Sequence, residues 1–307
     1  MASNYLSLAY LLLLAVSGNA IPIVDIPIIG STNISLANSA ASCFPALGFS
    51  MPSWVPSSTN GWWCDPSTEY AFVGFSYEVT ECQSKETLKR EFKDIRNKFS
   101  GRYVRLYGAC DRAGFYDDVI DAAWEATVGV HALIWFGFDN SPIWQTRRNQ
   151  LFLTLHTNPK AKFVTRLVQF GSEPLYDDVL DVGTLASQVW AAKANLQNLG
   201  IPVTISEMAS EFLGAGLKRS QLVYPTRERQ EDIHVGGSSL VFSQPTNVGN
   251  EADYFNLLDS KCEFFKTVAG GGVGWFAHIY ADGQEPGYGI YDVYWREKFW
   301  FRPRTRC

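Results

Sequence analysis

The chain has 307 residues, of which 46% are hydrophobic and 19% are charged, and its net charge is −5. This is the composition of an ordinary globular protein, with enough length for one large domain or two medium ones. The excess of acidic residues disfavours nucleic acid or an anionic membrane as a partner, because either would need a basic surface. The aromatic content of 14% fits either a large aromatic core or a surface that stacks on sugars.

The first twenty residues are typical of a secretion signal. Residues 6–16 form an apolar stretch that small and polar residues follow, which predicts cleavage after Ala20. The stretch is too short to span a bilayer, and no later segment is long and apolar enough to be a membrane helix. We therefore expect residues 1–20 to be a signal peptide and the mature chain to be extracellular, without a membrane span.

Six cysteines follow the predicted cleavage point. An even number of cysteines in a secreted chain indicates disulfides. Many pairings are possible, and proximity along the chain favours Cys43–Cys64, Cys82–Cys110 and Cys262–Cys307. The chain has no CxxC pair and no zinc-site spacing, so we expect neither a metal nor a cofactor. Asn33 stands in an Asn-Ile-Ser acceptor for glycosylation.

Residues 21–69 are rich in Ser, Pro, Asn and Ala and show no sustained period, which predicts an extended N-terminal arm. We expect the folded body to occupy residues 70–307. There, strand-like runs alternate with amphipathic segments such as 182–199, where apolar residues recur at helical spacing. The strand-like runs cover residues 70–79, 102–109, 129–138, 162–170, 201–208 and 272–281.

This alternation predicts a parallel sheet with helices outside it. The first five strand-like runs follow one another at steps of 27 to 40 residues, which is the repeat of a (β/α)8 TIM barrel. No glycine-rich phosphate loop follows the first run, which disfavours a nucleotide-binding doubly wound sheet.

Glu173 follows the apolar run 162–170 and precedes a proline, which places it where a buried parallel strand passes into a loop. The C-terminal mouth of the strands is where (β/α)8 enzymes keep their catalytic groups. Glu173 is therefore a candidate general acid. The alternative is a turn residue that caps the following helix, since a carboxylate in a cleft is only a statistical sign of catalysis.

Six segments of the folded body resemble secreted fungal proteins of glycoside hydrolase family 17, in their order and spacing. They are FVGFSYEVTECQS, RYVRLYGACD, HALIWFGFD, LVQFGSEPLYDDVL, IPVTISEMA and GGGVGWFAHIYADGQEPGYGIYD. The resemblance covers residues 70–211 and 248–307. It implies a (β/α)8 barrel that acts on cell-wall β-1,3-glucan as a hydrolase or a glucanosyltransferase, with the polysaccharide as its partner.

The resemblance also implies a retaining mechanism with two glutamates, about 5 to 5.5 Å apart. Glu173 matches the general acid/base of the family, at the end of strand four. Ser172 stands before it, where many relatives carry Asn, so the contact of that Asn with the sugar 2-hydroxyl does not carry over.

The second glutamate of the family, the nucleophile at the end of strand seven, has no counterpart. No Glu-x-Gly-Trp-Pro-like motif occurs between residues 209 and 271. Val203 and Val273 are 70 residues apart, whereas three barrel steps would take about 98. We therefore expect a barrel that is incomplete between strands five and eight, with a deletion around strands six and seven.

Several other residues are candidates for the site. Glu207 ends the fifth strand-like run and is a candidate substitute nucleophile, although its place on a neighbouring strand favours a hydrogen bond to substrate instead. Glu285, after the last run, is a candidate for contact with sugar hydroxyls, the alternative being a solvated loop. Aromatic residues near strand ends form either the floor of a glucan cleft or barrel packing. They are Tyr77, Tyr107, Trp135 and Tyr280.

Two functions remain open on the sequence. The first is a secreted β-1,3-glucan hydrolase or transglycosylase of the cell wall, in which Glu173→Gln abolishes turnover. The second is a non-catalytic glucan-binding or structural wall protein, which the missing nucleophile favours. We expect a monomer in either case.

Overall fold

The computed structural model describes residues 42–69, 71–138, 141–206, 247–268, 273–305 and 307. The predicted signal peptide, Asn33 and Glu207 lie outside the described residues. So does the stretch 207–246, in which the barrel repeat would have placed strands six and seven.

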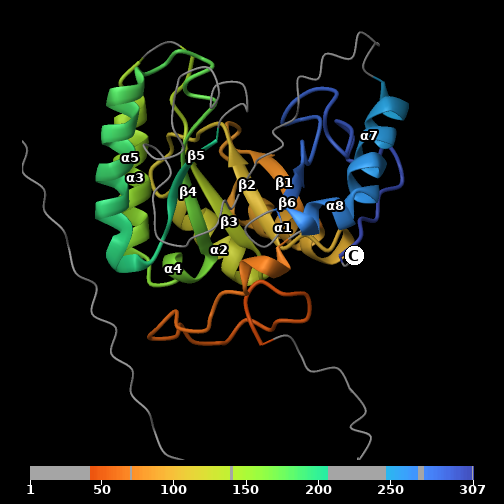
Figure 1. The fold of residues 1–307 in the computed structure, drawn as a ribbon, viewed down its shortest axis with the longest axis horizontal. Helices are drawn as coiled ribbons and strands as arrows, with labels where there is room; N and C mark the ends of the chain where they lie inside the picture. Colours follow the sequence, from red (N-terminus) through yellow and green to blue (C-terminus); the bar gives the residue numbers. More distant parts are fainter. Residues whose placement is uncertain (1–41, 70, 139–140, 207–246, 269–272, 306) are drawn as a thin grey trace, which may run out of the picture. The chain divides into compact units, whose positions relative to one another are not determined.

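The described strands form one sheet in which every pair of neighbours is parallel, in the order β5-β4-β3-β2-β1-β6. The strands are β1 (Ala71–Glu78), β2 (Tyr103–Tyr107), β3 (Gly129–Ile134), β4 (Thr165–Ser172), β5 (Val203–Ser206) and β6 (Gly274–Ala277). The last strand, β6, pairs with the first (Figure 1). That is how strand eight meets strand one when a barrel closes.

Helices separate the strands along the chain, as parallel pairing requires. They are α1 (Lys85–Lys98), α2 (Phe115–Ala126), α3 (Ile143–Thr157), α4 (Ala161–Val164), α5 (Val182–Leu196), α7 (Val248–Ser260) and α8 (Cys262–Thr267), with 3-10 turns η1 (Pro66–Thr68) and η2 (Gln197–Leu199). The described elements therefore form an incomplete TIM-barrel-like α/β fold, which confirms the predicted fold class.

Helix α1 shows how local sequence sets these elements. Ser84 caps its start, and the Ser84 hydroxyl accepts a hydrogen bond of 3.2 Å from the backbone N–H of Thr87. Leu88, Phe92 and Ile95 recur at helical spacing and are buried, so α1 packs one apolar face against the sheet.

Side chains on the strands alternate between two faces. On β2, Val104 and Leu106 belong to the main hydrophobic core that the helices share. Arg105 lies on the other face, where its guanidinium donates to the side chains of Gln169 on β4 and Ser206 on β5. The face away from the helices, which becomes the interior of the partial barrel, is therefore polar in its middle layer.

Residues 42–69 pack with the rest of the described chain, within the compact unit Ala40–Cys307. Trp62 anchors them. Its indole Nε1 donates to the carbonyl oxygen of Phe163 at 2.7 Å, and its ring stacks on Trp124 with 6.1 Å between centroids. The sequence of this segment has no helical or strand period because isolated aromatic side chains, rather than one face of a helix or strand, hold it in place.

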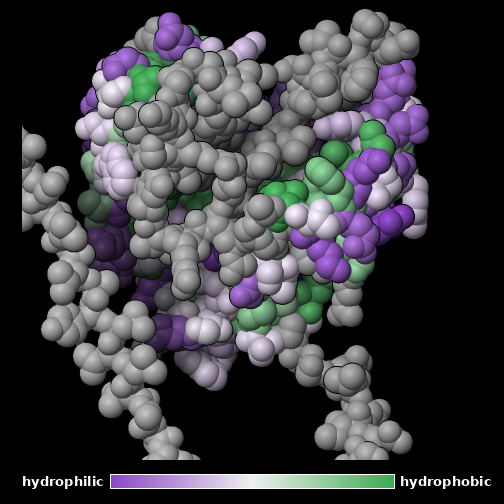
Figure 2. Space-filling view, viewed as in Figure 1, coloured by the Kyte–Doolittle hydropathy of each residue, from purple (hydrophilic) through white to green (hydrophobic). Residues whose placement is uncertain are grey.

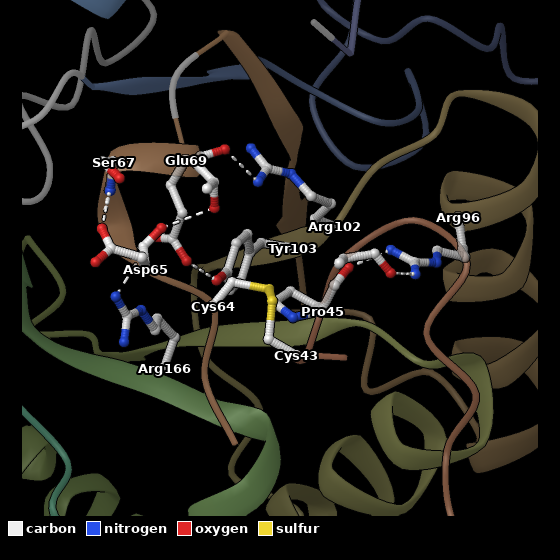
Figure 3. Close-up of a disulfide and its surroundings, with 12 residues drawn as sticks. Cys43, Pro45, Cys64, Asp65, Ser67, Glu69, Arg96, Arg102, Tyr103 and Arg166 are labelled. Carbon is white, nitrogen blue, oxygen red and sulfur yellow. Dashed lines mark hydrogen bonds and ion pairs between the residues drawn. A yellow bond between two sulfur atoms is a disulfide. The ribbon is translucent and has the colours of Figure 1, made fainter. Parts of the chain in front are cut away.

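Paired polar groups lie at the starts of the strands, beside the Cys43–Cys64 disulfide (Figure 3). Glu69 accepts a hydrogen bond from the Tyr103 hydroxyl and lies 3.5 Å from the guanidinium of Arg166. This end of the barrel is occupied by residues 42–69 and their partners. A substrate is therefore expected at the opposite end, where the strands finish.

Three disulfides join Cys43 to Cys64, Cys82 to Cys110 and Cys262 to Cys307. The pairing favoured by proximity along the chain is confirmed. Cys82 lies between β1 and α1, and Cys110 follows β2. This bond therefore links two adjacent loops at the C-terminal ends of their strands.

The surface around α7 and α8 carries exposed hydrophobic side chains, among them Leu257 and Phe264 (Figure 2). Phe255 and Phe265 of the same helices are buried, so each helix has an apolar inner face. None of the helices in the described ranges combines the length and hydropathy needed to cross a bilayer.

Candidate active site

Glu173 lies directly after β4, at the C-terminal mouth of the sheet. Its φ of +54° is in the left-handed region, which residues other than glycine seldom adopt. Its backbone N–H donates to the carbonyl of Ser206, at the end of β5, over 2.6 Å. The neighbouring strand therefore helps to hold the peptide of Glu173 in a conformation that an isolated loop would avoid.

The side chain of Glu173 is partly buried, and its pKa is raised. Burial is the main cause, because it disfavours the charged carboxylate, and the negative charge of Asp177 adds to it. The positive charge of Arg105 and the nearby His278 act in the opposite direction. A carboxyl group with a raised pKa retains its proton at higher pH than an ordinary glutamate, which suits a general acid.

Arg105 lies beneath this position and is only 3% exposed. Its guanidinium donates to Gln169 Oε1 at 2.9 Å, to Ser206 Oγ at 3.0 Å and to Ser172 Oγ at 3.3 Å. Arg105 thus connects β2 to β4 and β5 on both sides of Glu173. Sequence reasoning missed it, although an arginine within the apolar run 102–109 was the available signal.

Tyr107 and Trp135 join Glu173 at the mouth. Tyr107 ends β2, and its ring centroid lies 5.7 Å from Trp135 and 5.5 Å from His278. The pKa of Tyr107 is raised by burial and by the negative charges of Glu285 and Glu173. Two of the four predicted aromatic candidates therefore lie in one cluster with two of the three predicted carboxylates, Glu173 and Glu285.

The other two aromatic candidates point toward helix α1. The Tyr77 hydroxyl donates to Glu91 at 2.6 Å, and the Tyr280 hydroxyl donates to Asp94 at 2.9 Å. Both rings are buried. These placements support barrel packing, the alternative role, for Tyr77 and Tyr280, because neither ring is available to a sugar.

Glu285 is located in the turn after β6, with a third of its side chain exposed. Its Oε2 lies 2.8 Å from His278 Nε2. Asp282 braces the turn, since its Oδ1 accepts hydrogen bonds from the backbone N–H groups of Gly287 and Gly289. Glu285 is therefore part of an ordered cluster rather than of a solvated loop.

Glu78, at the end of β1, is a further carboxylate that sequence reasoning did not single out. It is buried, and its Oε1 accepts a 2.6 Å hydrogen bond from the backbone N–H of Thr80. Its pKa is raised, chiefly by burial, with smaller contributions from the charges of Glu81 and Glu285. Among the described residues no group of three His, Cys, Asp or Glu side chains is arranged to hold a metal ion.

This arrangement combines a half-buried acid, a buried guanidinium, two aromatic faces and a second carboxylate around one mouth. The polar groups can bind hydroxyls, the aromatic faces can stack on a sugar ring, and Glu173 can transfer a proton. Glu207, the fifth-strand candidate, lies outside the described residues.

No family model matches the chain, and no curated protein matches it in sequence. The solved structures similar to it include two of proteins from the fungus Rhizomucor miehei. One is the crystal structure of a glycoside hydrolase family 17 β-1,3-glucanosyltransferase from Rhizomucor miehei. It is 17% identical over 48% of this chain and 53% of that chain, with a TM-score of 0.39.

The other is an active-site mutant of Rhizomucor miehei β-1,3-glucanosyltransferase in complex with laminaritriose. It is 14% identical and covers 78% of this chain and 99% of that chain, with a TM-score of 0.53. At this identity the likeness concerns the fold alone. The described chain therefore has the fold of that β-1,3-glucanosyltransferase, as the resemblance to glycoside hydrolase family 17 implied.

Proposed function

We propose that the chain is a secreted protein of the glycoside hydrolase family 17 type, which acts on β-1,3-glucan with Glu173 as the general acid. The observation that carries this proposal is the position of Glu173, a partly buried carboxylic acid with a raised pKa at the mouth of β4. Glycoside hydrolysis needs such an acid, because the leaving oxygen must be protonated as the glycosidic bond breaks.

The surroundings of Glu173 fit that role. Ser206 holds its backbone, and Arg105 holds the side chains of Ser172 and Ser206. The backbone of Glu173 is thus held at the mouth, which helps to position its carboxyl group for proton transfer. Asp177 keeps the carboxyl group protonated at higher pH by its negative charge.

Tyr107 and Trp135 supply the surface on which we expect a glucose ring to stack. Their centroids are 5.7 Å apart with the rings at 50° to each other, so together they form a corner rather than a flat platform. Phe138, which is exposed, extends this aromatic surface through an edge contact with Trp135 at 5.1 Å. A curved aromatic wall suits a β-1,3-linked chain, whose successive rings turn relative to one another.

The substrate and the location of the protein rest on other observations. Glucan as the substrate rests on the sequence resemblance and on the laminaritriose bound to the similar structure. Secretion to the cell wall rests on the predicted signal peptide and is supported by three disulfides, which persist in oxidising compartments.

The second candidate function is a glucan-binding protein without chemistry. The absence of a Glu-x-Gly-Trp-Pro-like motif between residues 209 and 271 favours it. Under this alternative the aromatic surface of Tyr107, Trp135 and Phe138 binds glucan, and Glu173 has no catalytic role.

One experiment separates the two functions. The purified chain is incubated with a linear β-1,3-glucan oligosaccharide, and both sugar release and retention on insoluble glucan are measured for wild type, Glu173→Gln and Glu263→Gln. Glu263 is exposed on α8, so its substitution controls for the loss of one carboxylate. We expect release to vanish only in Glu173→Gln while retention persists. Equal release from Glu173→Gln and wild type would refute the assignment of the acid.

A further inference from the structure

A tight hairpin at residues 291–297 presents exposed aromatic side chains. Tyr291 and Glu297 form an antiparallel bridge at its base, and the N–H of Asp292 donates to the carbonyl of Arg296 over 2.9 Å. Exposed hydrophobic residues scattered singly are normal, whereas a group of them is a sign of a binding surface. Four of the eight residues 293–300 are large hydrophobic residues with exposed side chains, namely Val293, Tyr294, Trp295 and Trp300. We call the three aromatic ones, Tyr294, Trp295 and Trp300, the hairpin surface.

The tip of the hairpin is ordered by the side chain of Asp292. Its Oδ1 accepts hydrogen bonds from the backbone N–H groups of Tyr294 and Arg296, each over 2.9 Å, and its Oδ2 accepts from Arg296 Nε over 2.7 Å. Trp295 has a φ of +60°, in the left-handed region that a bulky residue seldom adopts. Its N–H donates to the carbonyl of Asp292, and its ring centroid lies 6.1 Å from that of buried Tyr280. The backbone that carries the rings is therefore ordered before a ligand arrives, which lowers the entropy lost on binding.

Two of the rings are supported on one face and open on the other. The guanidinium carbon of Arg302 lies 4.0 Å from the ring centroid of Trp300, and that of Arg296 lies 5.2 Å from the ring centroid of Tyr294. Trp300 is 74% exposed and Tyr294 is 75% exposed, so the ring face that points away from each guanidinium meets water. An open aromatic face of this kind can stack on the apolar face of a sugar ring.

The hairpin surface is anchored away from the mouth of the barrel. Helix α1 begins beside the mouth and runs back to the start of β2, and its 14 residues span about 21 Å. Lys98 ends this helix, and its ammonium lies 3.0 Å from the carboxylate of Glu297 in the hairpin. The guanidinium carbon of Arg302 lies 5.3 Å from the ring centroid of Phe99, the next residue of the chain. The hairpin and Arg302 are therefore attached at the end of α1 that lies away from the mouth.

Charge and size favour a neutral sugar polymer over other occupants of this surface. Arg296 pairs with Asp292, and Arg302 pairs with Glu297. The two arginines are thus neutralised and do not form a basic patch that would attract an anionic membrane. A stable protein interface takes about 20 to 30 residues from each partner, whereas the hairpin surface offers three aromatic side chains. A β-1,3-glucan is uncharged, and one aromatic ring is enough to stack on one of its sugars.

We propose that the hairpin surface is a second binding site for β-1,3-glucan, separate from the mouth, where the open faces of Trp300 and Tyr294 stack on sugar rings. This inference rests on the proposed function, which supplies glucan as the ligand. The second site holds one part of an insoluble polymer while the mouth acts on another. Because two sites on one polymer raise the local concentration of glucan at the mouth, the hairpin surface matters for the polymer and not for a short soluble substrate.

The test compares wild type with Trp300→Ala, Tyr294→Ala and the control Trp190→Ala. Trp190 is an exposed tryptophan with Lys193 Nζ 5.1 Å from its ring centroid, on α5, which packs on β5 at the opposite edge of the sheet from β6. Dissociation constants are measured on insoluble linear β-1,3-glucan, and kcat/KM on a short soluble β-1,3-glucan oligosaccharide. We expect each hairpin variant to raise the dissociation constant at least about fivefold, the equivalent of about 1 kcal/mol of ring stacking. We expect Trp190→Ala to match wild type, and kcat/KM to be the same in all four proteins.

Four results would overturn the second site while the proposed function survives, because wild type still retains glucan in each. They are wild-type retention in Trp300→Ala, an equal loss of retention in Trp190→Ala, a matching fall in kcat/KM on the oligosaccharide, and a wild-type dimer in sedimentation that Trp300→Ala converts to a monomer. The last would show that a second copy of the chain covers the surface. If wild type neither retains nor cleaves glucan, the proposed function falls together with this inference. Should Trp300→Ala fail to fold, Tyr294→Ala decides by the same measurements.

Discussion

Trp62 offers a direct test of whether residues 42–69 are part of the folded barrel. Truncating it to alanine removes an indole that is 9% exposed. An indole of this kind takes about 200 Å² out of water, which corresponds to at most about 5 kcal/mol at about 25 cal/mol per Å². Core Trp→Ala substitutions cost about 3–5 kcal/mol, so we expect a loss in this range.

Denaturant unfolding with the disulfides intact measures that loss as a shift in midpoint at constant slope. Trp62→Phe keeps an aromatic ring against Trp124 but leaves the carbonyl of Phe163 without its donor, and we expect it to cost about 1–2 kcal/mol. Trp54, in the same segment, is 70% exposed, and Trp54→Ala is the control, expected within about 0.5 kcal/mol of wild type. If Trp62→Ala unfolds with the midpoint of Trp54→Ala, these residues do not belong to the cooperative unit.

Four further predictions concern charged residues and the mouth. Because Asp177 raises the pKa of Glu173, Asp177→Asn should move the alkaline limb of the kcat/KM profile to lower pH, and an unmoved limb would contradict the coupling. Burial raises the pKa of Glu251 to about 7, so the folded state favours the protonated carboxyl group. This stabilisation is fully present below the pKa of Glu251 in the unfolded chain and is lost as the pH rises through about 7. Unfolding measured across that window checks this. Lys298→Gln should cost about 3–5 kcal/mol, because it removes the ammonium 2.8 Å from Glu251, and thermal unfolding measures the loss. Tyr107→Leu should weaken retention on insoluble glucan while changing the free energy of unfolding by no more than about 1 kcal/mol. Unchanged retention would count against stacking of glucan on Tyr107.

The order of the strands and the place of Glu173 could be predicted because both depend on local signals. A continuous apolar run marks each buried parallel strand, and Gly-Ser-Glu-Pro marks the exit from β4. The disulfides followed from proximity along the chain, since each bond joins cysteines that no other cysteine separates. These features need no knowledge of how one strand is placed against the next.

The roles of the aromatic candidates could not be predicted in the same way. Tyr77 and Tyr107 both stand at strand ends, yet Tyr77 faces α1 and Tyr107 faces the interior. Side chains alternate along a strand, so a shift of one residue in register reverses the face. The pairing of Glu78 with Tyr107 sets that register, and only the folded sheet supplies it. The same limit applied to Arg105, whose partners are on β4 and β5.

A fold shared with a glucanosyltransferase does not settle whether water or a second sugar is the acceptor, since this fold supports many chemistries through its loops. The two outcomes differ in whether water or a sugar hydroxyl reaches the anomeric carbon. Transfer needs a binding surface for the acceptor sugar, and exposed Tyr288, whose ring centroid lies 5.8 Å from that of His278, is one aromatic group beside the mouth. Hydrolysis needs only water in place of that sugar. If Tyr288 binds the acceptor, removing its ring in Tyr288→Ala should therefore suppress transfer products from a β-1,3-glucan oligosaccharide while hydrolysis continues.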